Sequence, residues 1–267
     1  MRPRSTRSKG SEAGEATTIV LADSAAEDGV ERLRFENLQI IHPNETIMIA
    51  DTDTQIAKGE RVLIVGPSGS GKSTLFRAIA GLWPWGTGKI FLPDRSRMMF
   101  MPQRPYLPLG TLRAAVAYPV PAHEFSAAAV EMALRRCGLE HLLDRLDERE
   151  GWDRILSVGE QQRLAFARLL LHKPDWVFMD EATSALDDDL QHSLMGLFKD
   201  ELAGTTVVSI AHREGMDAYH DRTLTLVTAV GGARLVTTRQ TPPARRPKPP
   251  RNRTLSSLVL RRSRPAG

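Results

Sequence analysis

The sequence predicts an α/β fold that is organised around a parallel sheet, with β-rich edges and an inserted helical subdomain. Two patterns carry this prediction. Short, continuous apolar runs alternate with helical segments, which is typical of parallel strands buried on both faces. From Pro102 to about Leu156 the pattern becomes helical and is punctuated by prolines. With 267 residues and 41% apolar content, the chain accommodates one large domain or two closely packed ones.

The expected strands begin near residue 31. Residues 31–41 and 45–50 are interpreted as short strands around the turn His42-Pro43-Asn44. Residues 61–65 (RVLIV) form a continuous apolar run, as expected of a buried parallel strand. Further strands are expected at residues 89–92, 97–101, 176–179, 205–211 and 222–227.

Capping residues mark the expected helices. Ser126 is a candidate N-cap, and Gly138 a candidate C-terminal glycine, of a helix in the inserted region. Residues 157–160 have the form S-x-x-E of a capping box, which predicts a helix to about His172 that Pro174 stops. The remaining expected elements are a helix over 72–80 that ends at Gly81, a helix over 187–202, and a hairpin at Gly231-Gly232.

Both ends of the chain differ in composition from the middle. Residues 1–10 carry four Lys or Arg and no acid, and residues 239–267 carry nine and no acid. Both ends are rich in Pro, Ser and Arg, a composition that cannot form a core. We expect a disordered basic segment at 1–30, a folded domain at 31–238 whose helical subdomain spans about 104–162, and a disordered Pro/Arg-rich tail at 239–267.

Composition also excludes several classes of protein. The single cysteine, Cys137, rules out an internal disulfide framework and suits a reducing compartment. No apolar run reaches the roughly 18 residues of a spanning helix, and the N-terminal segment has no apolar region of the kind that a secretory signal needs.

We expect the C-terminal tail to be solvated. Weak contact with anionic lipid is its functional alternative, and binding to nucleic acid is not expected.

Residues 66–73 (GPSGSGKS) match the pattern G-x-x-x-x-G-K-[ST] of a phosphate-binding loop. Glycines allow successive backbone N–H groups and a helix N-terminus to approach a triphosphate closely. Lys72 is expected to reach the β- and γ-phosphates, and the hydroxyl of Ser73 to ligate Mg²⁺. An apolar strand precedes this loop and a helix follows it. The sequence therefore predicts a P-loop NTPase core that binds ATP and Mg²⁺.

Two carboxylates follow the expected strand at 176–179. In an open α/β sheet, ligands bind at the carboxyl ends of the strands, so Asp180 is expected near the Mg²⁺, acting through water. Glu181 lies one residue further out, where a carboxylate can orient and deprotonate the attacking water. His212 follows the next apolar strand at the same edge and is expected to contact the γ-phosphate. The expected catalytic residues are therefore Glu181, His212 and Lys72.

Residues 156–163 (LSVGEQQR) resemble the signature of ABC ATPases, which P-loop kinases and small GTPases lack. The usual form of this signature is LSGGQ or LSGGE, so Val158 replaces the first glycine. The resemblance covers about residues 31–230. It implies that the signature contacts the ATP held by a second copy, so that two copies, a homodimer, enclose two ATP·Mg²⁺ head to tail.

The same resemblance assigns roles to other residues. Gln103, in MPQRPYLPLGTL, resembles the glutamine that reaches Mg²⁺ and senses the transmembrane partner, and residues 184–187 (SALD) match the D-loop. The nucleotide-binding residues implied by loop and resemblance together are Gly66, Pro67, Ser68, Gly69, Ser70, Gly71, Lys72, Ser73, Thr74, Gln103, Ser157, Gly159, Glu160 and Gln161. The implied metal ligands are Ser73, Gln103 and Asp180.

The segments GLWPWGTGKI and PQRPYLPLGTLRAAVAYP resemble the exporter-type peroxisomal fatty-acyl half-transporters, and equally their bacterial relatives linked to cobalamin, bleomycin or peptide transport. This implies a membrane permease, fused or as a separate chain, and a place on the cytoplasmic face of a membrane, expected to be the bacterial inner membrane. Many family members stack adenine on an aromatic residue. The nearest positions here are Ile41, His42 and Pro43, while Phe35 is expected in the core.

Two alternatives remain open at this point. The first is a soluble ABC ATPase that acts on nucleic acid or ribosomes through the basic tail, for which salt-dependent binding would speak. The second is a non-hydrolysing regulatory cassette, for which Val158 leaves room and against which Glu181 and His212 argue. A P-loop kinase offers no account of residues 156–163.

Overall fold

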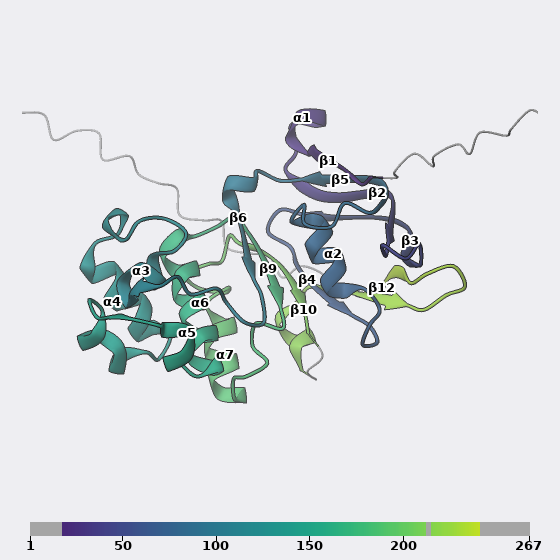
Figure 1. Cartoon of the computed structure of the whole chain (residues 1–267). Helices are drawn as coiled ribbons and strands as arrows, with labels where there is room; N and C mark the ends of the chain where they lie inside the picture. The colour runs from purple at the N-terminus through teal and green to yellow at the C-terminus, as the bar shows by residue number, and fades with distance from the viewer. Residues whose placement is uncertain (1–17, 212–214, 241–267) are drawn as a thin grey trace, which may run out of the picture.

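The computed structural model describes residues 18–211 and 215–240 and confirms the predicted α/β fold with a parallel sheet (Figure 1). Six strands form the central sheet in the order β12-β11-β4-β10-β9-β6, and all pairs are parallel except β11 with β12. These strands are β4 (Arg61–Val65), β6 (Met98–Met101), β9 (Trp176–Asp180), β10 (Thr206–Ile210), β11 (Arg222–Val227) and β12 (Arg234–Gln240).

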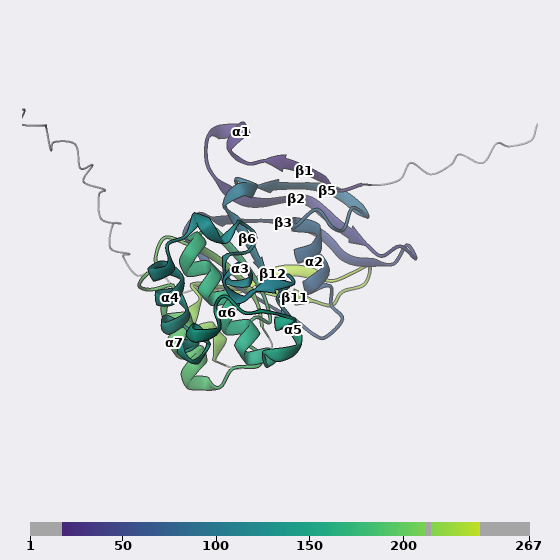
Figure 2. The same cartoon turned by 60° about the vertical axis from the view of Figure 1, so that its left-hand side comes forward.

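Alternate residues of the central strands face two different cores. In β9, Trp176 and Phe178 belong to one hydrophobic cluster, whereas Val177 and Met179 belong to the other. Continuous apolar runs thus arise because both faces of the sheet are covered. The face of Trp176 packs against helix α2 (Lys72–Ile79) and a second sheet, and the opposite face packs against the helical subdomain (Figures 1 and 2).

The second sheet has four strands in the order β1-β5-β2-β3. The strands are β1 (Val20–Asp23), β2 (Arg32–Ile41), β3 (Ile47–Ala57) and β5 (Gly86–Leu92), and a short helix α1 (Ala25–Asp28) follows β1. The predicted turn at residues 42–44 does separate β2 from β3, but β3 runs to Ala57 rather than to residue 50. Its distal half alternates buried and exposed positions, as expected of an antiparallel strand with one solvated face.

The expectation that residues 1–30 lack structure is wrong for the part that the structure describes. Strand β1 pairs in parallel with β5 through Val20–Lys89 to Asp23–Leu92, and Ile19 is 6% exposed. This segment takes its structure from pairing with the neighbouring strand. The overall composition of residues 1–30 did not reveal so short a strand. Residues 1–17 and 241–267 lie outside the described residues. At the other end, β12 extends to Gln240, two residues into the expected tail.

The helical subdomain lies between β6 and β9 in sequence, where it was predicted (Figure 2). Both predicted N-caps are confirmed, because the hydroxyl of Ser126 accepts from Ala129 N at 3.2 Å and Ser157 forms a complete capping box with Glu160. Gly138 has a φ of 68°, as expected after a helix end. The helices are α3 (Leu112–Ala117), α4 (Ala127–Arg136), α5 (Trp152–Ile155) and α6 (Val158–His172), and a small pair β7 (Gly110–Thr111) and β8 (Arg149–Glu150) joins them.

Helix α7 (Asp188–Gly196) is shorter than the predicted 187–202. It stops at Gly196, a residue of low helix propensity, and the chain continues to residue 204 in turns that bury Leu197, Phe198 and Leu202. The predicted hairpin at Gly231-Gly232 is confirmed, with φ values of 87° and 116°.

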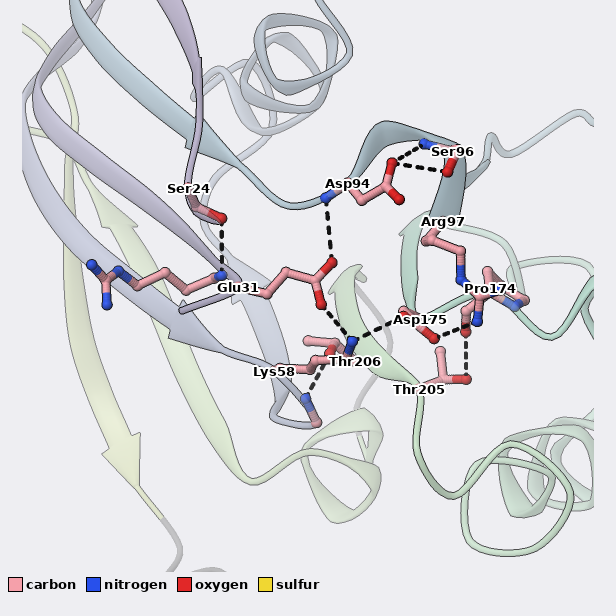
Figure 3. Close-up of polar contacts among 12 residues, drawn as sticks. Ser24, Glu31, Lys58, Asp94, Ser96, Arg97, Pro174, Asp175, Thr205 and Thr206 are labelled. Carbon is pink, nitrogen blue, oxygen red and sulfur yellow. Dashed lines mark hydrogen bonds and ion pairs between the residues drawn. The ribbon is translucent and has the colours of Figure 1, made fainter. Parts of the chain in front are cut away.

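The amino-terminal ends of the central strands are joined to the second sheet by an ion cluster of Glu31, Lys58, Arg97 and Asp175 (Figure 3). Asp175, just before β9, accepts from Lys58 Nζ at 2.9 Å and from Arg97 at 2.8 Å, and Lys58 also pairs with Glu31. The bond from Arg97 is the main reason why the pKa of Asp175 is lowered. This cluster orders the edge of the sheet that lies opposite the carboxyl ends of the strands.

Candidate functional site

The carboxyl ends of three central strands align at one edge of the sheet. Ile64 of β4 pairs with Ile210 of β10, and Ile210 pairs with Asp180 of β9. The loop after β4, the carboxylates after β9 and the segment after β10 therefore begin at the same level. The structure thus brings the predicted phosphate loop and the two predicted carboxylates together.

The loop at residues 66–73 takes the backbone conformation that its glycines allow. Gly69 and Gly71 have φ values of 75° and 96°, and Gly71 is the N-cap of α2. A Cβ atom added to Gly71 would lie 3.3 Å from Ile49 Cγ1, and one added to Gly66 would lie 3.0 Å from the carbonyl oxygen of Leu226. Side chains larger than glycine would displace the loop at both positions.

Lys72 lies in the first turn of α2 and is 5% exposed. Its Nζ donates to the carbonyl oxygens of Gly66 at 2.9 Å and Pro67 at 2.8 Å, so the amine lies inside the loop. Burial lowers the pKa of Lys72, and the nearby carboxylates of Glu181 and Asp180 only partly oppose this shift. A desolvated cation with two weak neutral partners is well suited to a strongly anionic ligand.

Two further features of the loop fit a phosphate group. Within the described residues, Ser70 Oγ is buried and has no hydrogen-bond partner. A Cβ atom added to Gly69 would meet no atom within 4 Å, so the space beside this backbone is open. The loop thus offers a phosphate the backbone N–H groups at the start of α2, an unpaired hydroxyl and an ammonium group.

Ser73 and Asp180 line the same surface pocket, of about 310 Å³, whose other lining residues are mostly apolar. A hydroxyl and one carboxylate are the protein ligands that Mg²⁺ commonly uses when phosphates and water complete its shell. In the part of the chain that the structure describes, no group of three His, Cys, Asp or Glu side chains could hold a metal without such a ligand. The donor set therefore fits Mg²⁺ held together with a phosphate.

Glu181 follows β9 in a left-handed backbone conformation, with a φ of 51°. Its N–H donates to Ile210 O at 3.0 Å, which ties it to the end of β10. The amide of Gln103 donates from Nε2 to Glu181 Oε2 at 3.0 Å. Non-glycine residues adopt such φ values rarely, and Glu181 is one of five that do so among the described residues. The structure thus brings together Gln103 and Glu181, which are 78 residues apart in sequence.

His212 lies outside the described residues, so its expected contact with the γ-phosphate stays a prediction. The residue before it, Ala211, follows Ile210 at the level of Asp180. The described backbone therefore leads to the expected edge.

The predicted signature residues divide into exposed and buried ones. Ser157 and Val158 are exposed at the start of α6. Glu160 accepts from Ser157 N at 2.9 Å and from His141 Nε2 at 2.8 Å. Partial burial raises the pKa of Glu160, but these bonds outweigh it and the pKa is lowered. In this structure the Glu160 carboxylate thus caps the start of α6 and contacts His141.

Gln161, which the resemblance implies as a nucleotide-binding residue, is turned inward in this structure. It is 8% exposed, and its Nε2 donates to the carbonyl oxygens of Asp153 and Leu156, each at 2.9 Å. Gln161 lies about one helical turn beyond the exposed Ser157, and its two hydrogen bonds to the α5–α6 connection hold the side chain inward. Gly159 remains close to the 184–187 segment, since a Cβ added there would lie 3.2 Å from Ala185 O.

One residue of this site was not predicted. Gln162 is fully buried and its amide contacts Gln103, Ser184 and Ala185. In the sequence, only its position beside the signature pointed to a place in the site. The sequence alone does not reveal whether Gln161 or Gln162 makes these contacts.

The region expected near adenine contains His42 and Pro43 on the surface and Ile41 partly buried. Trp83 Nε1 donates to Ile41 O at 3.0 Å, and the rings of Trp83 and His42 lie 6.0 Å apart. Phe35 is 2% exposed, which confirms its place in the core.

The chain is similar to known proteins. The sequence profile of the ABC transporter family matches residues 49–184. An ABC transporter ATP-binding protein of Haemophilus influenzae is 43% identical over 192 residues, which make up 72% of this chain and 32% of the relative. The ATP-binding cassette sub-family D member 3 of Mus musculus is 34% identical over 225 residues, or 81% of this chain and 34% of the relative.

Among solved structures, a bacterial Atm1-family ABC exporter with ATP bound is similar, with a TM-score of 0.68 and 28% identity. The match covers 82% of this chain and 39% of the exporter chain. The chain thus spans about a third of the length of the curated relatives it matches. No helix in the described residues has the length and apolar character needed to cross a membrane.

Proposed function

Because this chain belongs to the ABC transporter family as an ATP-binding domain, we propose that it hydrolyses ATP at the shared strand edge, within a head-to-tail dimer, to drive a membrane permease. The observation that carries this proposal is the 3.0 Å hydrogen bond from Gln103 to the Glu181 carboxylate, beside the loop of Lys72. This bond fixes the direction of the candidate base, and the same carboxylate partly opposes the lowering of the Lys72 pKa by burial.

The proposed chemistry assigns one task to each side chain. Glu181 accepts a proton from the attacking water, while Gln103 fixes the direction of its carboxylate. Lys72 leaves its two loop carbonyls to neutralise charge that develops on the terminal phosphate. Ser73 and Asp180 would hold Mg²⁺, which would neutralise phosphate charge and orient the leaving group. His212 completes the site as a donor to the terminal phosphate.

The proposal needs a second copy because the signature lies apart from the phosphate loop of its own chain. Ser157 and Val158 line a pocket with Arg104 and Tyr106, whereas Ser73 lines the separate pocket of Asp180. Ser157 also begins the 15-residue helix α6, whose N-terminus favours anions. In a head-to-tail pair, this exposed end would meet the ATP that the partner holds.

The proposed permease contact lies beside the Gln103 segment. Leu82, Tyr106 and Leu109 are 72%, 62% and 84% exposed, and Phe100 joins Leu82 at the rim of the Ser73 pocket. Exposed apolar side chains at a hollow are typical of a protein contact. The Atm1-family neighbour is an exporter whose chain extends well beyond the matched part. This supports a place at the cytoplasmic side of a membrane. More specifically, we propose the bacterial inner membrane and a lipid contact of residues 241–267.

Phosphate release from ATP by the purified chain tests the proposed activity. Lys72→Ala should abolish both ATP binding and Mg²⁺-dependent turnover, because it removes the ammonium group of the loop. Lys173→Ala should retain both ATP binding and turnover, because Lys173 ends α6 ahead of β9, at the opposite end of that strand from Asp180. A Lys72→Ala variant that turns over ATP at the wild-type rate would contradict the proposal.

A further inference from the structure

Gln162 joins three segments that converge on Glu181. Its side chain is fully buried in α6. Nε2 donates to Gln103 O at 3.1 Å and to Ser184 Oγ at 3.2 Å, and a longer contact of 3.4 Å reaches Glu181 O. Oε1 accepts from Ala185 N at 3.0 Å. One amide thus touches the backbone of Gln103, the backbone of Glu181 and the 184–185 segment.

These contacts engage both polar atoms of the side chain. A glutamine amide has two N–H donors and a carbonyl oxygen that accepts. The two N–H donors of Gln162 share three oxygens, those of Gln103 O, Ser184 Oγ and Glu181 O, and Oε1 accepts from a backbone N–H. A buried amide with all its groups in use restricts its partners to one arrangement, since any shift leaves a buried polar group unpaired.

Gln162 contacts the residue that holds the carboxylate of the proposed base. Gln103 uses its side chain to hold the Glu181 carboxylate, and Gln162 holds the backbone of Gln103. The same helix holds the next part of this segment, because Arg168 Nη2 donates to Tyr106 O at 2.9 Å. Helix α6 therefore fixes the segment 103–106 at both ends.

Gln162 also lies apart from the phosphate loop. Lys72 is held by the loop carbonyls of Gly66 and Pro67, and no hydrogen bond of Gln162 within the described residues reaches residues 66–74. Its removal should therefore disturb the base and leave ATP binding in place.

We propose that Gln162 is a positioning residue for ATP hydrolysis, which orients the Glu181 carboxylate through Gln103 and links it to the 184–185 segment. This inference rests on the proposed hydrolysis at Glu181. Because the 184–185 segment is exposed, a partner that contacts it would act on the base through one buried amide.

The test replaces Gln162 by Met, which has a similar length and no amide, and by Glu, which retains the acceptor for Ala185 N but loses both N–H donors. Each variant should lower kcat by about 10- to 100-fold, as expected when a catalytic group is misplaced. The KM and the Kd for ATP should stay within about threefold of the wild type. Leu202→Ala, a buried residue remote from the site, controls for lost stability and should retain kcat.

A double-mutant cycle separates positioning from a merely structural role. In a Glu181→Gln background, Gln162→Met should change the residual turnover by less than about twofold, because there is no base left to orient. An unchanged kcat in either folded variant, or a full additional loss in the Glu181→Gln background, would overturn the inference. If Glu181→Gln itself retains wild-type turnover, the proposed function fails first and the inference fails with it, so the two failures are distinct.

Discussion

His220 is a buried histidine just before β11, in contact with Ser209 of β10. Its Nδ1 lies 2.7 Å from Met216 O and its Nε2 lies 2.8 Å from Ser209 Oγ. A carbonyl can only accept, so Nδ1 carries the proton and Nε2 accepts from the hydroxyl. Burial lowers the pKa of His220 to about 4. The folded chain therefore keeps this ring neutral at every pH at which most histidines titrate.

This burial predicts a loss of stability in acid. Between pH 6.5 and about 4 the unfolded chain binds a proton at His220 and the folded chain does not, so the free energy of unfolding falls as the pH falls through this window. From pH 7 to pH 5 the wild type should lose about 2 kcal/mol more than His220→Gln. Urea unfolding at both pH values measures this.

The control is His123→Gln, which changes an exposed histidine and should keep the wild-type pH dependence. Equal losses in the wild type and His220→Gln would show that the ring is protonated in the folded state.

At the scale of residues, the sequence identifies chemistry better than orientation. The loop glycines, Lys72 and the Asp180-Glu181 pair could be predicted, because phosphate binding and a strand end restrict which residue types can work there. The left-handed φ of Glu181 and the inward turn of Gln161 could not. The first depends on Ile210, which lies on another strand, and the second on the 153–156 stretch, which belongs to α5 and its connection to α6.

At the scale of elements, two serine N-caps offer a matched pair. Ser126 caps α4 and Ser157 caps α6, and each accepts from the N–H three residues on. Replacement of either by Ala should lower the free energy of unfolding by about 1 kcal/mol. Only Ser157→Ala should also lower ATP turnover, because only that helix end is proposed to meet ATP. Thermal unfolding and phosphate release measure the two effects, and equal turnover in both variants would refute the proposed role of the α6 end.

Elements with a strong local signal were predicted, and those that depend on tertiary pairing were not. Strands β4 and β11 match their predicted ranges, and α6 begins and ends at its capping signals. Strand β1 was missed because its order comes from the parallel partner β5. The two-residue strands β7 and β8 are too short to leave a periodic pattern.

At the scale of the molecule, the site is built from segments that the parallel sheet brings to one edge, while the signature lies on the helical subdomain. A Glu181→Gln chain, which is expected to bind ATP without hydrolysing it, should therefore double its mass in light scattering when ATP·Mg²⁺ is added. Ser157→Arg in the same background should stay monomeric, because a bulky side chain would occupy the position of the partner's nucleotide. Dimerisation that ignores Ser157→Arg would place the interface elsewhere.

The central claim is that Glu181 is the base for ATP hydrolysis. A single-turnover measurement of phosphate release at saturating ATP·Mg²⁺ tests it most directly, with Glu181→Gln compared to the wild type. The variant should bind ATP with wild-type affinity and release phosphate about 10²- to 10⁴-fold more slowly, since the amide held by Gln103 can no longer take up a proton. Phosphate release by Glu181→Gln at the wild-type rate would contradict the account.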